Sequence, residues 1–315
     1  MGNVFYFAWE SDLIKWMQAN LEGFGVTLAY LVSVFGEEMM FVAILGFLYW
    51  CWDKRLGLSV GLSLLTASLW NPLVKNIALR QRPYMADPGI RCLKAVDPKA
   101  DVMDVAAQGY SFPSGHSCGS AATYVKAALG LKKRGFLILA IALTFLVGFS
   151  RIILGVHYPT DVLAGWSLGL LAVVLTGLLE KRVRNRAVIY LILIGTALPG
   201  VFYCHTNDYF SALGMMGGLA LGEFFERRFV HFENTRRVVP MILRTLGGFA
   251  LFFGLNTLLK LPFSKEFLES AAPASFAVRS LRYLAVTFAL IGPYPMLFKL
   301  FDKKGSAEGS VKEEN

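Results

Sequence analysis

The sequence predicts an all-α fold, a polytopic bundle of about nine transmembrane helices. Hydrophobic residues make up 55% of the chain and charged residues only 17%, and the mean hydropathy is +0.52. Apolar runs recur along the chain, and each is close to the roughly 20 residues that a helix needs to cross a hydrocarbon core of about 30 Å. A water-soluble domain would not need repeated runs of this length.

The expected spans follow one another along most of the chain. They are Val26–Trp50, Leu56–Val74, Ser117–Leu131, Phe136–Leu154, Val162–Leu179, Ala187–Cys204, Tyr209–Phe225, Pro240–Leu259 and Leu281–Phe298. The preceding segment, Val4–Leu21, mixes aromatic residues with Glu10 and Lys15, which predicts an interfacial amphipathic helix; a partly ordered tail is the alternative. No cleavable signal peptide is apparent, so the first spans are expected to direct insertion.

The distribution of basic residues predicts how the chain is oriented across the membrane. Connections rich in Lys and Arg, such as Lys132–Arg134 and Lys181–Arg186, alternate with connections such as Tyr158–Asp161 and His205–Asp208 that have none. An outside N-terminus and a cytoplasmic C-terminal tail satisfy this alternation. The net charge of +9 then anchors cytoplasmic loops, and no nucleic-acid partner is expected, because no basic patch is interleaved with exposed aromatics.

Three polar motifs lie on the expected exoplasmic side: KNIALRQRP at Lys75–Pro83, PSGH at Pro113–His116 and SRIILGVHYPTD at Ser150–Asp161. Lys75, Arg82 and Arg151 stand at the ends of spans, where charges facing a common pocket indicate function. They can surround phosphate oxygens, and the guanidinium groups can bind two oxygens at once. Ser114 and Gly115 allow backbone N–H groups to approach an anion at a helix start.

The histidines complete a site for phosphoryl transfer. Asp161 follows His157 by four residues, so its carboxylate can accept from one imidazole nitrogen and leave the other unprotonated toward phosphorus. His157 is therefore the expected nucleophile, and His116 the acid that protonates the leaving oxygen and later activates water. Either histidine alone would more often be a hydrogen-bonded structural residue. The three motifs together favour catalysis.

At these residues the chain resembles the type 2 phosphatidic acid phosphatase superfamily, whose pattern is K-x6-RP, PSGH and SR-x5-H-x3-D. Every fixed position matches: Lys75, Arg82, Pro83, Pro113, Ser114, Gly115, His116, Ser150, Arg151, His157 and Asp161. The resemblance covers about Val26–Leu179 and implies an all-helical, metal-independent membrane phosphatase with no cofactor. Nine spans are similar to the layout of glucose-6-phosphatase, but topology does not fix a substrate.

The resemblance divides the chain into an interfacial segment at 1–25, a catalytic core at 26–180, additional transmembrane helices at 181–301 and a disordered cytoplasmic tail at 302–315. The leading hypothesis is an integral membrane phosphatase, in a bacterial plasma membrane, that hydrolyses a lipid phosphate or prenyl pyrophosphate at the exoplasmic face through a phosphohistidine. Membrane lipids and this substrate are the expected partners. A phosphotransferase using the same phosphohistidine, or a lipid transporter or scramblase, is the alternative.

Other polar residues invite weaker expectations. Arg91, Lys94 and Lys99 in the long loop are expected to be solvated, and Lys126 and Arg244 to reach the cytoplasmic interface by snorkelling. Glu37 and Glu38, inside the first apolar run, should face a polar cavity or pair with a buried cation, either in the phosphate pocket or as a lock between spans.

Two patterns concern packing and cross-linking. The stripe Gly214, Gly218 and Gly222 favours close intramolecular helix packing over a homodimer seam. A Cys92–Cys204 disulfide is possible on the exoplasmic side but is not the favoured interpretation.

Overall fold

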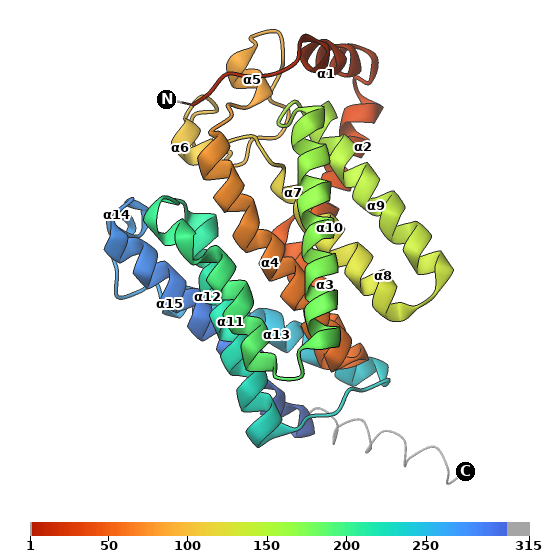
Figure 1. Cartoon of the computed structure of the whole chain (residues 1–315), viewed down its shortest axis with the longest axis vertical. Coiled ribbons are helices and arrows are strands. Elements are labelled where there is room, and N and C mark those ends of the chain that lie inside the picture. The colour runs from red at the N-terminus through yellow and green to blue at the C-terminus, as the bar shows by residue number, and fades with distance from the viewer. Residues whose placement is uncertain (1, 301–315) are drawn as a thin grey trace, which may run out of the picture. The chain divides into compact units, whose positions relative to one another are not determined.

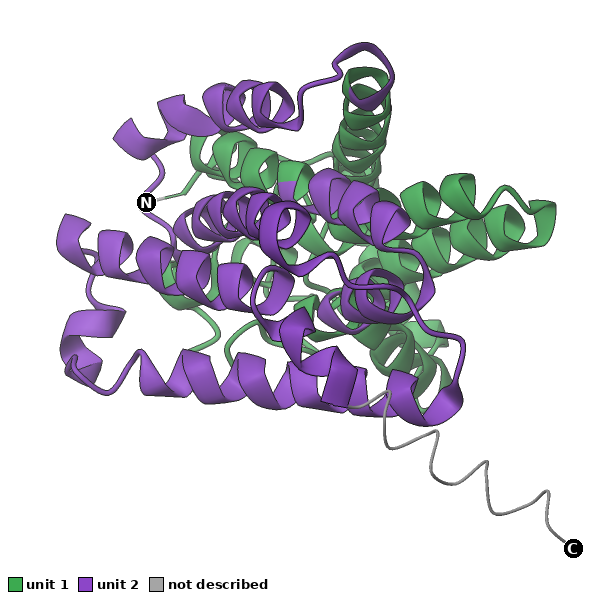
Figure 2. Ribbon diagram, turned by 90° about the horizontal axis from the view of Figure 1, so that it is seen from below, with its two compact units in different colours: residues 1–41, 66–179 green, residues 42–65, 180–315 purple. Residues whose placement is uncertain are grey.

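The computed structural model describes residues 2–300, and its elements are helices joined by short turns and one long loop, which confirms the all-α class (Figure 1). The expected tail at 302–315 lies outside the described residues. Two compact units share the chain, one made of residues 1–41 and 66–179 and the other of residues 42–65 and 180–315; they are called unit 1 and unit 2 (Figure 2).

Unit 1 contains the N-terminal helices and the helices that carry the three motifs. Its elements are α1 (Ala8–Asn20), α2 (Phe24–Ser33), a 3-10 turn (Val34–Gly36), the end of α4 (Lys54–Ala78), α5 (Pro83–Ala86), α6 (Val105–Gln108), α7 (Gly115–Ser120), α8 (Lys126–Leu131), α9 (Arg134–Ile153) and most of α10 (Pro159–Arg182). A π-helical stretch, Ala121–Val125, joins α7 to α8 into one continuous helical segment.

Unit 2 contains the remaining helices. Its elements are most of α3 (Glu38–Phe47), a π-helical stretch (Leu48–Trp52), the start of α4, α11 (Arg186–Ala197), a 3-10 stretch (Leu198–Phe202), α12 (Asn207–Phe225), a second π-helical stretch (Glu226–Val230), α13 (Val238–Leu258), α14 (Lys265–Glu269), α15 (Pro273–Ile291) and a 3-10 turn (Tyr294–Leu297).

Five described helices, α4, α9, α10, α13 and α15, are long and apolar enough to cross a membrane, and the number rises to six if the bent pair α1–α2 is one span. The expected nine are therefore not all shown. The segments Glu38–Trp52 and Arg186–Phe202 are apolar but shorter than a full span. The expected single span Val26–Trp50 is interrupted, because Glu37 takes an extended backbone conformation between the 3-10 turn and α3.

Helix α1 meets α2 at a bend of 116°. Trp9 and Trp16 on α1 are more than half exposed, as expected for aromatic residues at a membrane interface. The opposite face of α1 buries Glu10 and Gln18, which the amphipathic pattern does not predict.

The glycine stripe packs within unit 2. A Cβ atom at Gly214 or Gly218 would collide with the backbone carbonyls of Ser280 or Leu284 on α15. A Cβ atom at Gly222 would instead lie 2.7 Å from the Cβ atom of Ile291. The three glycines thus allow α12 and α15 to approach closely, which supports the intramolecular interpretation.

Two snorkelling predictions are wrong. Lys126 is buried and donates to Thr176 Oγ1 on α10. Arg244 on α13 is 2% exposed and donates to the carbonyl oxygens of Trp50 and Glu233. Both cations find polar partners inside the protein and do not need to reach the interface.

Candidate active site

Unit 1 brings all the predicted site residues together. Lys75 lies in the last turn of α4, Arg82 precedes α5, and Arg151 lies in the last turn of α9. Ser114, Gly115 and His116 begin α7, His157 lies in the connection between α9 and α10, and Asp161 is in the first turn of α10.

The start of α7 is fixed against α10. Ser114 is the N-cap of α7, and its backbone N–H donates to the carbonyl oxygen of Asp161 at 2.9 Å. A Cβ atom at Gly165 would lie 2.6 Å from the carbonyl oxygen of Ser114, so a glycine permits the close approach of the two helices there. The PSGH motif and the third motif are therefore joined through a backbone hydrogen bond.

Asp161 begins α10 and faces His157. Its Oδ2 accepts from the backbone N–H of Tyr158 at 2.7 Å, a contact that closes the first turn of the helix, and also from Ser111 Oγ. His157 Nδ1 lies 3.5 Å from the same oxygen, and among the described residues it has no hydrogen-bond partner.

Arg80 holds the other side of Asp161. Its Nη1 donates to Asp161 Oδ1 at 2.7 Å, and its Nη2 donates to Glu10 Oε2 at 2.8 Å. Glu10 Oε1 accepts from the backbone N–H and the hydroxyl of Thr160. We call Glu10, Arg80, Thr160, Asp161 and Ser111 the Arg80 network. Glu10, Arg80 and Asp161 are each at most 2% exposed, so their contacts are shielded from water.

Sequence reasoning left the role of Arg80 open and missed that of Glu10. Arg80 belongs to the first motif region, but its spacing does not say which carboxylate it meets. The backbone of the N-terminal segment adds a further contact, because Arg80 Nε donates to the carbonyl oxygen of Phe5. The guanidinium also lies over the ring of Tyr158, 4.0 Å from the ring centroid. The sequence shows only that Glu10 stands among the aromatic residues of the expected interfacial helix, and its burial is a finding of the structure.

Positive charge surrounds His157. Burial lowers the pKa of its imidazole well below the ordinary value of 6.5, and the charges of Arg82, Arg151 and Lys75 lower it further. The imidazole is therefore held neutral, the form that can attack phosphorus. The same three cations are those that the motif spacing predicts for the phosphate oxygens.

Arg82 also has a structural role that the motif does not predict. Its Nε and Nη2 donate to the carbonyl oxygen of Gln108, and its Nη1 donates to that of Val156. These bonds tie the long loop to the residue before His157. Each terminal nitrogen carries a second N–H, so Arg82 can hold the loop and a phosphate oxygen at once.

Arg151 offers donors that the protein itself does not use. Its side chain is 2% exposed, and among the residues that the structure describes Nε and Nη1 have no hydrogen-bond partner. It lies within electrostatic reach of both His157 and His116. A buried guanidinium with unused donors is costly unless a ligand supplies an anion.

The break between α2 and α3 borders His116. A Cβ atom at Gly36 would lie 2.9 Å from His116 Cδ2. The next residue, Glu37, accepts from Lys94 Nζ at 2.6 Å, which confirms its expected pairing with a cation. Lys94 also donates to Ser33, so its expected solvation is wrong, whereas Arg91 and Lys99 are exposed as predicted.

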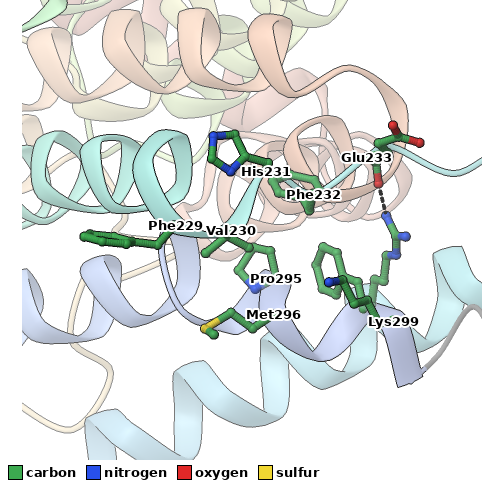
Figure 3. A pocket seen from close by; sticks show the side chains of 10 residues that line it. Phe229, Val230, His231, Phe232, Glu233, Pro295, Met296 and Lys299 are labelled. Carbon is green, nitrogen blue, oxygen red and sulfur yellow. Dashed lines mark hydrogen bonds between the residues drawn. The ribbon is translucent and has the colours of Figure 1, made fainter.

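A cavity of about 350 Å³ lies in unit 2 and contains none of the predicted site residues (Figure 3). It is lined by aromatic and aliphatic side chains together with His231, Glu233, Arg244 and Lys299. Within residues 2–300, no group of three His, Cys, Asp or Glu side chains is placed to hold a metal ion, and the four cysteines are free thiols.

Helices of membrane-spanning length, and two histidines within electrostatic reach of the buried cations Arg82 and Arg151, define a membrane protein built for an anionic ligand. Residues 56–202 match the PAP2 superfamily, and residues 210–306 match the family described as PAP2 superfamily phosphatase, transmembrane extension. The chain belongs to the PAP2 superfamily of membrane phosphatases. This is the family that the three motifs indicated.

Three curated relatives of the chain are phosphatases by name. Decaprenylphosphoryl-5-phosphoribose phosphatase of Mycobacterium tuberculosis is 35% identical over 44% of this chain and 71% of its own length. Undecaprenyl-diphosphatase of Sulfolobus acidocaldarius is 29% identical over 50% of this chain and 70% of its own. Phosphatidylglycerophosphatase B of Bacillus subtilis is 40% identical, but the match spans only 24% of this chain and 42% of that protein. No solved structure matches the chain significantly.

Proposed function

We propose that this protein hydrolyses a lipid phosphate or prenyl pyrophosphate at the exoplasmic face of the membrane, through a phosphohistidine on His157. The observation that carries the proposal is the buried guanidinium of Arg151, whose Nε and Nη1 have no partner in the described protein, beside two histidines. A phosphate group is the ligand that best fits such a fork of donors.

The first step forms the phosphoenzyme. Nε2 of His157 attacks phosphorus, and the bond from phosphorus to the leaving oxygen breaks while His116 gives that oxygen a proton. Lys75, Arg82 and Arg151 bind the non-bridging oxygens, whose charge is redistributed in the transition state. The continuous helical segment that begins at Ser114 directs its positive end toward the same anion.

The second step hydrolyses the phosphohistidine and regenerates the free enzyme. His116, now neutral, removes a proton from water, whose oxygen attacks phosphorus and breaks the bond to His157. The products are inorganic phosphate and the lipid with one phosphate fewer. Asp161 keeps the imidazole of His157 oriented, and Arg80 with Glu10 positions Asp161, because the carboxylate is held from both of its oxygens.

The substrate class follows from the relatives' names and from the membrane setting. Two of the three relatives are named for prenyl-linked phosphates and one for a glycerophospholipid phosphate. Such substrates reach a site at the end of a helix laterally from the bilayer. Prenyl pyrophosphates and prenyl phosphates are therefore the first candidates.

A panel of lipid phosphates and pyrophosphates tests the proposal. Purified protein in detergent with EDTA should release inorganic phosphate from at least one prenyl or glycerolipid substrate, and His157→Ala should not. Adding an alcohol separates the phosphotransferase alternative, since a phosphorylated alcohol would then replace inorganic phosphate. The transporter alternative predicts a different result. The wild type would release no phosphate from any substrate, and lipid would still move between leaflets with His157→Ala.

A further inference from the structure

Arg282 is a buried cation in a membrane-spanning helix. It lies at the middle of α15, and its side chain is 5% exposed. Its Nε donates to Asn256 Oδ1, near the end of α13, at 3.3 Å. In the part of the chain that the structure describes, Nη1 of Arg282 has no hydrogen-bond partner and no carboxylate pairs with the guanidinium.

Such a group is costly as it stands. A guanidinium stays charged under all ordinary conditions, and a buried charge without an opposite charge loses its hydration with no compensation. Arginines in transmembrane helices normally face a carboxylate, backbone carbonyls or water. Arg282 has one neutral amide oxygen at long distance, so an anion from outside the chain would complete its coordination.

Lys260 brings a second cation to the same place. It stands two residues after the end of α13 and is exposed. Burial, followed by the charges of Arg282 and Arg279, lowers the pKa of the Lys260 amine. Cations from α13 and α15 therefore repel one another at this point, and a bound anion would relieve the repulsion as well as satisfy Arg282.

The surroundings indicate where the anion comes from. Leu258 on α13 and Leu281 on α15 are 58% and 64% exposed, next to Lys260 and Arg282 in sequence. Exposed leucines on membrane-spanning helices face acyl chains. We propose that Arg282 and Lys260 bind the phosphate group of an anionic phospholipid whose chains lie against α13 and α15, a lipid site built entirely from unit 2. It uses none of the residues placed in the catalytic site.

Thermal unfolding of delipidated protein in detergent tests this site. Phosphatidylglycerol should raise the Tm of the wild type, whereas glycerol phosphate at the same concentration should not, because it lacks the acyl chains. In Arg282→Met, phosphatidylglycerol should no longer raise the Tm. We call this lipid-induced rise in Tm the increment. Its Tm without lipid should be unchanged or higher, since the variant no longer buries an uncompensated charge. A purely structural bond to Asn256 would give the opposite pattern, a lower Tm and an intact increment, and would overturn the proposal.

Controls separate this site from others. Lys265→Gln removes an exposed cation of the neighbouring α14 and should keep the full increment. Arg151→Gln should also keep it, which excludes lipid bound in the catalytic site. An increment lost with Arg151→Gln but kept with Arg282→Met would place the lipid in the catalytic site and overturn the proposal. Glycerol phosphate alone reproducing the increment would overturn the assignment to a lipid.

Native mass spectrometry measures phosphatidylglycerol binding directly and tests the site even if Arg282→Met does not fold. Lys260→Gln changes an exposed side chain, and the apparent Kd for phosphatidylglycerol should rise by roughly tenfold, as expected on losing one charge-assisted contact. An unchanged Kd in Lys260→Gln together with an unchanged Kd in Arg282→Lys would contradict the proposal, since the guanidinium fork and the amine would then both be dispensable.

Discussion

Arg80 Nη1 donates to Asp161 Oδ1 at 2.7 Å, and both side chains are at most 2% exposed. The second terminal nitrogen of Arg80 meets Glu10 on the N-terminal helix α1. A helix with exposed aromatic residues is thereby linked through one guanidinium to the carboxylate beside His157. The position of Asp161 thus depends on α1 as well as on α10.

This linkage predicts that changes at Glu10 act on turnover. Glu10→Gln and Arg80→Lys should each lower kcat by roughly 10-fold to 100-fold, because small displacements of a catalytic group carry costs of this size. KM should change little, since neither residue is placed to touch phosphate. Steady-state kinetics with a lipid phosphate measures both constants.

Lys15→Gln is the matched control on α1. Lys15 pairs with Asp87 at 2.6 Å on a more exposed part of the helix. That variant should keep a normal kcat. Equal losses in Lys15→Gln and Glu10→Gln would mean that α1 matters only for folding and not for the position of Asp161.

Arg151→Lys tests the unused donors of Arg151. The variant keeps the charge and loses the fork, so kcat/KM should fall at least roughly tenfold. Vanadate, which mimics a five-coordinate phosphate, should inhibit the wild type more strongly than the variant. Full activity in Arg151→Lys, or no inhibition of the wild type by millimolar vanadate, would show that the phosphate pocket is misassigned.

The pH dependence follows from the electrostatics of His157. Its pKa lies below 6.5, so the neutral nucleophile persists as the pH falls through 6.5, and the acid limb of kcat/KM, which reports the free enzyme, should have its midpoint below that value. Lys75→Gln removes a neighbouring positive charge, which should move this midpoint upward. A wild-type midpoint at or above 6.5, or a downward shift in Lys75→Gln, would argue against a His157 held neutral by its neighbours.

Topology sets the pool of substrates. A cysteine introduced at Lys99, in a background without the native cysteines, should react with a membrane-impermeant maleimide in intact cells. A cysteine at Lys133 should react only after permeabilisation. Both lysines are exposed, so access to the label depends on the side of the membrane. Reverse labelling would place the site on the cytoplasmic face and make cytosolic phosphates the leading candidates.

Short sequence motifs predicted the contacts between residues that lie within a few positions of one another in the chain. The motif spacing located the two histidines, and the His157–Asp161 spacing predicted a pair that lies 3.5 Å apart across one helix start. Long-range partners were not predictable in this way. Glu10 lies 70 residues from Arg80, and Glu37 lies 57 residues from Lys94, so only the folded chain reveals these contacts.

The structure does not show all nine expected spans, for a related reason. Hydropathy averaged along the sequence predicts one continuous apolar run over Val26–Trp50, because the apolar neighbours outweigh Glu37 and Glu38. The folded chain ends a 3-10 turn at Gly36 and starts a new helix at Glu38, with Glu37 extended between them. Hydropathy also does not show that Lys126 and Arg244 find partners inside the protein.

Trapping the phosphoenzyme tests the central claim most directly. Protein turning over a lipid substrate labelled in its terminal phosphate, in the presence of EDTA, is quenched with alkali and digested, and the labelled peptide is sequenced. The account predicts an acid-labile, alkali-stable label on His157 that is absent from His157→Ala. Phosphate release at the normal rate in His157→Ala, or a label on another residue, would contradict it.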